Sequence, residues 1–244
     1  MEKEIKIRTG DSFAVQGVLT MASKERSKKL IVLVHGLTGF KNEHIFYNGA
    51  AFFAKKGFDV FRFDFYSGGR DSRKLSKSTL RSHASDLNRV VRHFDNYEKI
   101  FLVGHSLGGL TVLLADLNNV RGIVLWDPSG GLDGKLTGIL NYCRYIKSIQ
   151  IYIMDWGVET VIGRRMYEEW KHTPSPREIM EGVNVPIEII NAGKGVLKRV
   201  GGEYFKWAKK PKRLVVIKNA GHTFDEEGSE KKLFGETFNW IKRF

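Results

Sequence analysis

The chain has 244 residues, of which 42% are hydrophobic and 27% charged, a balance typical of a globular protein with a large core. No apolar run approaches the roughly 20 residues needed to span a bilayer, and the first residues lack the apolar stretch of a secretory signal. A single cysteine, Cys143, excludes an internal disulfide bond and fits a reducing compartment. We therefore expect a cytoplasmic protein without stable membrane insertion.

The formal net charge of +13 is the unusual feature of the composition. A charge of this size is compatible with an anionic partner such as nucleic acid or a lipid surface. The lysines and arginines are dispersed, however, and no basic run alternates with aromatic residues that could stack on bases. We therefore expect a solvated basic surface and no nucleic-acid partner, while the oligomeric state stays open.

Hydrophobic patterning predicts strands and helices that alternate along most of the chain. Two strands at 4–8 and 13–20 flank a first turn. Further strands are predicted at 30–34, 58–63, 100–103, 122–126, 186–190 and 214–217, and helices at 44–56, 79–94, 110–117 and 230–241. This alternation predicts the α/β class, with a mostly parallel sheet covered on both faces and the first two strands at its antiparallel edge.

Residues 132–180 interrupt the alternation. The segment is rich in aromatic residues and methionine and is longer than one crossover helix needs. Because long insertions between core elements are usually functional, we expect a small inserted helical cap at 132–180 and a core formed by 1–131 and 181–244. The alternative is two ordinary helices whose aromatic side chains pack in the core.

The sequence Gly104-His105-Ser106-Leu107-Gly108 has the pattern G-x-S-x-G between a predicted strand and a predicted helix. In that setting the pattern predicts a sharp turn that lifts the serine hydroxyl above the sheet and points a helix N-terminus at developing negative charge. Ser106 is therefore the candidate nucleophile. The alternative is a glycine-rich turn with a solvated serine.

A serine nucleophile needs hydrogen-bond donors for the oxyanion that forms during acyl transfer. One donor is expected to be the backbone N–H of the following residue, Leu107. The second is expected from the loop after the first long buried strand, His35-Gly36-Leu37-Thr38-Gly39, where the N–H of Leu37 is the candidate. The alternative for this loop is a plain turn at the end of a strand.

Seven histidines compete for the role of general base. His222 lies between the last predicted strand and the closing helix, at the edge of the sheet to which Ser106 also points. His105 adjoins the nucleophile, so its side chain is expected to point away from it. The remaining helical histidines are typical of helix surfaces or packing: His44, His83 and His93. We therefore expect His222 to be the base, with a loop histidine bonded to a backbone carbonyl as the alternative.

In this order, His35-Gly36, the Ser106 motif and Gly221-His222 resemble the α/β-hydrolase superfamily. The stretch Arg62-Phe63-Asp64-Phe65, followed by two glycines and a serine, is similar to its esterase and lipase branch. Within that branch, small-cap cinnamoyl and feruloyl esterases look nearest.

The resemblance implies a serine hydrolase that cleaves carboxylic esters through an acyl-enzyme, with Ser106 as nucleophile and His222 as base. It implies no cofactor, and no spacing of histidine, cysteine or carboxylate residues points to a metal. The expected partner is a small-molecule ester, which the aromatic composition of the inserted segment favours as hydrophobic or aromatic.

The acid departs from the family pattern. Family members usually carry it after the strand predicted at 186–190, yet 191–199 contain neither Asp nor Glu. Asp127 follows the strand at 122–126 in an Asp-Pro context similar to that of pancreatic-type lipases. We therefore expect Asp127 to hydrogen-bond to His222. The alternatives are a turn cap at Asp127, Asp225 as the acid, and a Ser–His dyad oriented by water.

Two further interpretations stay open. The same serine site would serve a thioesterase, a lipase-like enzyme or a C–C bond hydrolase. A non-catalytic binding protein of the same fold is the other interpretation, and it rests on the missing acid at 191–199.

Overall fold

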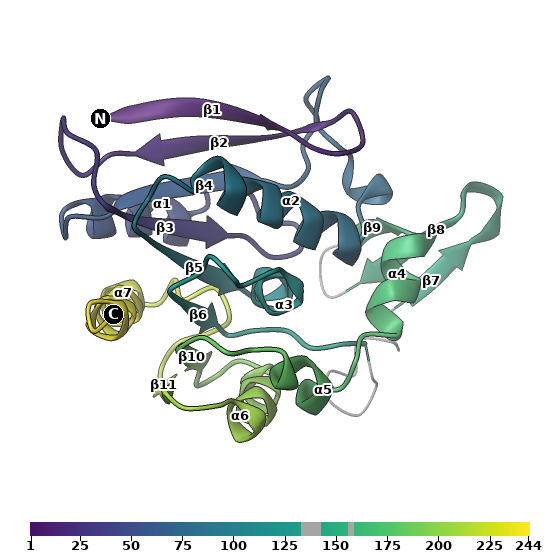
Figure 1. The fold of residues 1–244 in the computed structure, drawn as a ribbon. Helices are drawn as coiled ribbons and strands as arrows, with labels where there is room; N and C mark the ends of the chain where they lie inside the picture. Colours follow the sequence, from purple (N-terminus) through teal and green to yellow (C-terminus); the bar gives the residue numbers. More distant parts are fainter. Residues whose placement is uncertain (133–142, 156–158) are drawn as a thin grey trace.

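The structure is a computed structural model that describes residues 1–132, 143–155 and 159–244 (Figure 1). Eight strands form its central sheet: β1 (Glu2–Arg8), β2 (Ala14–Thr20), β3 (Lys29–Val34), β4 (Asp59–Asp64), β5 (Lys99–His105), β6 (Gly122–Trp126), β10 (Ile187–Ala192) and β11 (Lys212–Ile217). Their order across the sheet is β1-β2-β4-β3-β5-β6-β10-β11. Only the pairs β1–β2 and β2–β4 are antiparallel, so the mostly parallel sheet with an antiparallel edge is confirmed.

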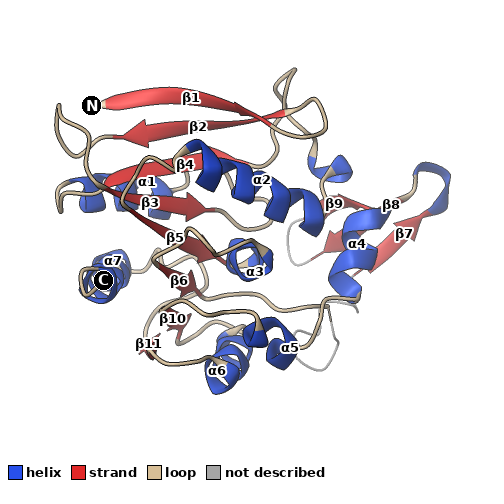
Figure 2. Cartoon of the chain, viewed as in Figure 1, coloured by secondary structure: helices blue, strands red, loops and turns tan. Residues whose placement is uncertain are grey.

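Helices cover both faces of this sheet (Figures 1 and 2). On one face lie α1 (His44–Ala54) and α7 (Ser229–Ile241), and on the other lie α2 (Leu80–His93), α3 (Leu107–Leu114), α5 (Pro176–Glu181) and α6 (Lys198–Trp207). The α/β class with helices on both faces is therefore confirmed.

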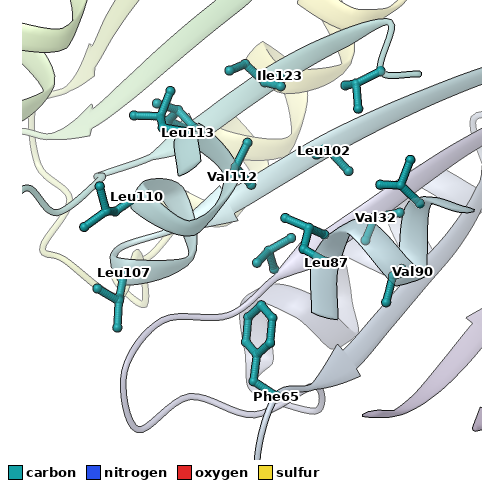
Figure 3. Packing of buried hydrophobic residues seen from close by; sticks show 14 of the residues in the cluster. Val32, Phe65, Leu87, Val90, Leu102, Leu107, Leu110, Val112, Leu113 and Ile123 are labelled. Atoms are coloured by element: carbon teal, nitrogen blue, oxygen red, sulfur yellow. The ribbon is translucent and has the colours of Figure 1, made fainter. Parts of the chain in front are cut away.

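The strand β3 shows why helices must pack on both faces of the sheet. Its residues Leu30, Val32 and Val34 lie in one buried cluster, whereas Ile31 and Leu33 lie in the other. Since successive side chains of a strand point to opposite faces, a continuous apolar run is stable only where both faces are buried. Figure 3 shows the first of these clusters, where α2 and α3 meet the strands.

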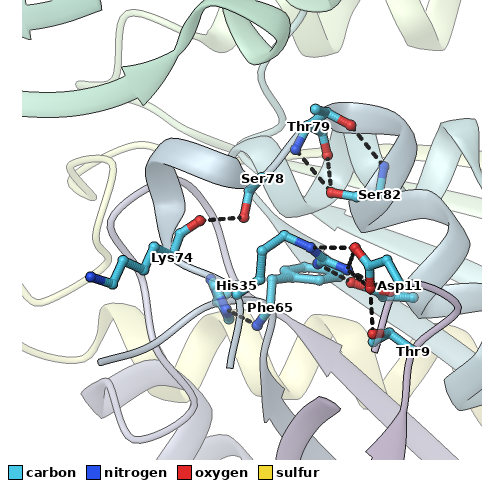
Figure 4. Close-up of polar contacts among 10 residues, drawn as sticks. Thr9, Asp11, His35, Phe65, Lys74, Ser78, Thr79 and Ser82 are labelled. Carbon is cyan, nitrogen blue, oxygen red and sulfur yellow. Dashed lines mark hydrogen bonds and ion pairs between the residues drawn. The ribbon is translucent and has the colours of Figure 1, made fainter. Parts of the chain in front are cut away.

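The start of α2 is set by a capping box. The side chain of Thr79 accepts from the N–H of Ser82, and the side chain of Ser82 accepts from the N–H of Thr79 (Figure 4). These two bonds satisfy N–H groups that a helix leaves unpaired at its first turn. The sequence prediction of a helix at 79–94 is thereby confirmed to within a residue at each end.

The inserted segment differs from the expected helical cap. Besides α4 (Arg164–Lys171) and α5, it contains a three-stranded antiparallel sheet of β7 (Cys143–Ile146), β8 (Ile151–Asp155) and β9 (Glu159–Gly163). The β-branched and aromatic residues of Ile151–Asp155 and Glu159–Gly163 favour strands, a preference that the expectation of helices overlooked. The term helical therefore describes only part of this segment.

Among the described aromatic side chains of the segment, only Trp170 is buried, and the tyrosines at 145, 152 and 167 are partly exposed. Trp170 is buried and donates from Nε1 to the carbonyl of Gly130 at 2.7 Å, while Tyr152 and Tyr167 stack with ring centroids 3.7 Å apart. Residues 133–142 and 156–158 of the predicted cap lie outside the described residues. The boundaries 132–180 and a role for the segment in covering the site stay predictions.

Among the described residues, no helix combines the length and the apolar character needed to cross a membrane.

Candidate active site

Ser106 occupies a strained turn between β5 and α3. Its backbone has φ 55° and ψ −121°, a conformation that costs a residue with a side chain about 1–3 kcal/mol. Backbone hydrogen bonds to the next strand and the residues after it hold the serine there: its N–H donates to the carbonyl of Trp126 at 3.0 Å, and its carbonyl accepts from the N–H of Ser129 at 3.0 Å. The neighbouring strand β6 and the residues after it thus fix the position of the serine.

The glycines on either side of Ser106 allow this turn to pack closely. A Cβ atom on Gly104 would lie 2.5 Å from the carbonyl oxygen of Gly108, and one on Gly108 would lie 2.2 Å from that of Val34. Any side chain at these positions would push α3 away from the sheet. The motif therefore has a steric reason for both glycines.

The structure brings His222 and Asp127 together. Nδ1 of His222 lies 2.6 Å from Oδ2 of Asp127, and Oδ1 of Asp127 accepts from the N–H of Ala192 at 3.0 Å. Asp127 is fully buried and His222 is partly exposed. Because Nδ1 donates to the carboxylate, Nε2 of a neutral His222 is left as the acceptor nitrogen. Asp225, the weaker candidate, is exposed.

His105 has a role that the sequence did not predict. Its Nε2 donates to the backbone carbonyl of His222 at 2.8 Å, and the two imidazole rings lie 4.7 Å apart. Burial lowers the pKa of His105 to about 3, so the ring is neutral at physiological pH. This side chain anchors the loop that carries His222 to the end of β5.

The carbonyl of Gly36 is held by several donors. It accepts from Nδ1 of His35 at 2.8 Å, from the hydroxyl of Tyr66 at 3.1 Å and from the N–H of Gly39 at 3.2 Å. In a planar trans peptide the following N–H points opposite to the carbonyl. The N–H of Leu37 is therefore turned away from these donors, and His35 and Tyr66 help to fix its direction.

The imidazole of His35 is itself fixed from its other side. Its Nε2 accepts from the N–H of Phe65 at 3.1 Å (Figure 4). Burial lowers the pKa of His35, which keeps the ring neutral with its proton on Nδ1. The bond from Phe65, the residue after β4, thus fixes the tautomer of His35 in which Nδ1 donates to the Gly36 carbonyl.

The other predicted oxyanion donor, Leu107, is the first residue of α3. Its N–H belongs to the first turn, where a helix has no acceptor of its own for such groups. The side chain is buried against the core while the N–H follows directly on Ser106. The partial positive charge of a helix N-terminus adds to this donor.

A cavity of about 190 Å³ lies beside Ser106 and His222. It is lined by the loop 36–39, by Ser106 and His105, by His222 and Thr223, and by the start of α1 at 43–45. Leu37, Ser106 and His222 thus face one space. None of the described residues of the inserted segment lines this cavity, so contact between the substrate and the predicted cap stays a prediction.

A second hollow of about 850 Å³ lies between the segment 76–81 and the elements β8, β9 and α4. It contains none of the predicted site residues. Among the described residues, no group of three or more histidine, cysteine or carboxylate side chains is arranged to hold a metal ion.

A family model described as the α/β hydrolase fold matches residues 29–136. Methylesterase 8 of Arabidopsis thaliana is 33% identical over 94 residues, which are 38% of this chain and 34% of that protein. The chain thus matches only about a third of the length of this relative.

Solved structures match over nearly the whole chain. The esterase domain of a Rhodothermus marinus protein has a TM-score of 0.78 at 18% identity, covering 100% of this chain and 98% of that one. An esterase of Butyrivibrio proteoclasticus with bound ferulic acid has a TM-score of 0.78 at 18% identity, covering 98% and 99%. Strand order, the turn at Ser106 and these matches together show that the chain has the α/β-hydrolase fold.

Proposed function

We propose that this chain is a serine hydrolase that cleaves carboxylic esters, with Ser106 as nucleophile, His222 as general base and Asp127 as the acid that orients the base. The observation that carries the proposal is the 2.6 Å hydrogen bond between His222 and Asp127, beside Ser106 in one cavity. The esterases among the similar structures support an ester as substrate.

In the first half of the reaction, Oγ of Ser106 attacks the ester carbonyl carbon while Nε2 of His222 takes its proton. The carbonyl oxygen becomes an oxyanion, for which the N–H groups of Leu37 and Leu107 are the donors. The carbon–oxygen bond to the alcohol then breaks, and His222 returns the proton to the leaving alcohol. The product is an acyl-enzyme on Ser106.

In the second half, water takes the place of the alcohol. His222 accepts a proton from the water as its oxygen attacks the acyl carbon, and Ser106 leaves with that proton. The buried carboxylate of Asp127 stabilises the imidazolium in both halves, and its hydrogen bond to the N–H of Ala192 keeps it aimed at Nδ1. The proposed steps use no cofactor.

The substrate we propose is a small ester with a hydrophobic or aromatic acyl group. The cavity at Ser106 is small, at about 190 Å³, which suits one compact group rather than a long chain. The relative with bound ferulic acid shows that an aromatic acid fits a site of this fold. The thioesterase and C–C hydrolase interpretations use the same serine and are distinguished by the substrate panel below.

The non-catalytic interpretation loses its main reason. It rested on the absence of an acid from 191–199, but the carboxylate that bonds His222 comes from Asp127 instead. A fluorophosphonate probe tests this point, because it reacts with an activated serine and not with an ordinary one.

The decisive experiment measures hydrolysis of p-nitrophenyl butyrate, a matched thioester and a β-diketone by the purified chain. We expect the ester to react fastest, and the substitution Ser106→Ala to lower kcat by about 10⁴-fold or more and to abolish probe labelling. Ser148→Ala, an exposed serine in the inserted segment, is the matched control and should keep both properties. A Ser106→Ala variant with the unchanged rate would refute the proposal.

A further inference from the structure

Glu43 brings a carboxyl group into the cavity at Ser106. It precedes α1 and lines the cavity together with Ser106 and His222. Among the described residues that line this space, Glu43 is the one with a carboxyl group, and none is a lysine or arginine. The charge that a substrate meets beside the nucleophile is therefore set largely by this side chain.

The folded chain itself makes little use of this carboxyl. Glu43 occupies the N-cap position of α1, yet its side chain makes no capping hydrogen bond, although such a bond is the usual role of an N-cap side chain. Its neighbour His44 pairs with Glu230 instead, at 2.7 Å. Within the described part of the chain, no hydrogen bond or ion pair to the Glu43 carboxyl is found.

The surroundings make an unpaired charge at Glu43 costly. Burial raises the pKa of the Glu43 carboxyl, and the imidazoles of His44 and His222 offset only part of this effect. A partly buried carboxylate without a donor is stabilised by any ligand that supplies one. The site is therefore complementary to a hydroxyl or ammonium group and unfavourable to a second carboxylate.

The position of Glu43 decides which part of the ester it meets. His222 must lie within hydrogen-bond reach of the leaving oxygen, because it protonates that oxygen. Glu43 shares the cavity wall with His222 and interacts with its charge. Groups attached to the leaving alcohol thus share this cavity with the Glu43 carboxyl.

We propose that Glu43 is a specificity-determining residue that accepts a hydrogen bond from a hydroxyl or ammonium group on the leaving alcohol and disfavours leaving alcohols that carry a carboxylate. The inference rests on the proposed ester hydrolysis at Ser106. It adds the class of alcohol to the class of reaction.

The test uses three butyrate esters of nearly equal shape, whose leaving alcohols are 2-(dimethylammonio)ethanol, 3-methylbutanol and 3-hydroxypropanoate. We expect kcat/KM to fall in that order for the unmodified chain. Neutralising Glu43 in Glu43→Gln should lower the ratio between the first and third esters by about tenfold, since charges in a partly buried cavity interact more strongly than charges in water.

Two further variants make the result decisive. Glu43→Asn also removes the charge and places a preferred N-cap residue before α1, so it keeps the helix start intact and should give the same fall in the ratio. Glu98→Gln removes an equal charge from an exposed position that pairs with Lys28, and it should leave the ratio unchanged. Because both substitutions change the formal net charge of +13 by the same amount, a difference between them cannot come from the overall charge.

An unchanged ratio in both neutral variants at Glu43, with esters still cleaved, would overturn this inference and leave the proposed function standing. If the unmodified chain cleaved none of the three esters, the proposed function would fail and the inference with it.

Discussion

Oδ2 of Asp127 lies 2.6 Å from Nδ1 of His222, although 95 positions separate the two residues in the sequence. The strands β6 and β10 are neighbours, so a carboxylate at the end of β6 reaches the space above the end of β10. The loop after β10 leaves room for it, because a Cβ atom on Gly195 would lie 2.8 Å from Oδ2 of Asp127. An acid after β6 and a glycine after β10 are thus complementary features of one site.

The first prediction concerns this acid. Asp127→Asn keeps the shape of the side chain but replaces an acceptor by an amide, so His222 loses the partner that fixes its tautomer. We expect kcat for p-nitrophenyl butyrate to fall by about 10³–10⁴-fold, as in serine proteases that carry the same change. Asp225→Asn, at an exposed position, should keep nearly the full rate. Nearly full activity of Asp127→Asn would remove Asp127 from the mechanism.

The sequence predicted the central sheet well because its signals are local. The run Leu30-Ile31-Val32-Leu33-Val34 is continuous and apolar, which is the pattern of a strand covered on both faces. The turn at Ser106 was also recognisable, since the G-x-S-x-G pattern between a strand and a helix is a local signal. Short-range patterns of this kind can be recognised in the sequence alone.

Some of the missed features have weak or ambiguous local signals, and others depend on contacts through space. Helix α6 was not predicted, because Gly201 and Gly202 lower its helix propensity and hide the spacing of Val200 and Tyr204. The strands β7 to β9 were hidden because aromatic composition alone does not distinguish strand from helix. The bond between Tyr66 and Gly36 joins residues 30 positions apart, which no local pattern marks.

The second prediction concerns the orientation of the Leu37 N–H. Tyr66→Phe removes one donor from the Gly36 carbonyl while the bonds from His35 and Gly39 remain. The peptide becomes less firmly oriented, so the oxyanion loses stabilisation that exists only in the transition state. We expect kcat to fall by about 3–10-fold with little change in KM.

The control for this variant is Tyr47→Phe, an exposed tyrosine on α1. It should change neither kcat nor KM, and both variants should unfold at temperatures close to that of the unmodified chain. A rise in KM at constant kcat for Tyr66→Phe would show that the hydroxyl acts in ground-state binding rather than in positioning.

The third prediction concerns stability and pH. Burial of Glu188 within β10 raises the pKa of its carboxyl to about 8, and the nearby Arg213 offsets only part of the shift. From the unfolded value of 4.5 up to about 8, the folded chain holds a proton that the unfolded chain releases. Stability from this group is therefore greatest below pH 4.5 and is lost progressively as the pH rises to about 8.

Glu188→Gln removes the titration, so its Tm relative to that of the unmodified chain should be higher at pH 9 than at pH 5, by at least about 2 °C. Thermal unfolding followed by circular dichroism measures the difference. Glu98→Gln, an exposed carboxyl, is the control and should give no such trend. A difference that shrank with rising pH would contradict the sign of this argument.

The fourth prediction separates two kinds of glycine. Gly108 lies where a Cβ atom would come within 2.2 Å of the carbonyl oxygen of Val34, so Gly108→Ala forces α3 away from β3. We expect a loss of about 1–3 kcal/mol or more in the free energy of unfolding, the cost of overpacking a close-packed interior. The rate should fall as well, because the same shift displaces Ser106 and the first N–H of α3.

Gly235 in α7 is the matched control, since a Cβ atom there meets nothing within 4 Å. Gly235→Ala should raise the free energy of unfolding by about 0.5–1 kcal/mol, because alanine has the better helix propensity. Urea unfolding of both variants measures the two free energies. Equal and small effects at the two positions would mean that the turn at Ser106 yields to a methyl group, and the steric reason for Gly108 in the motif would then be wrong.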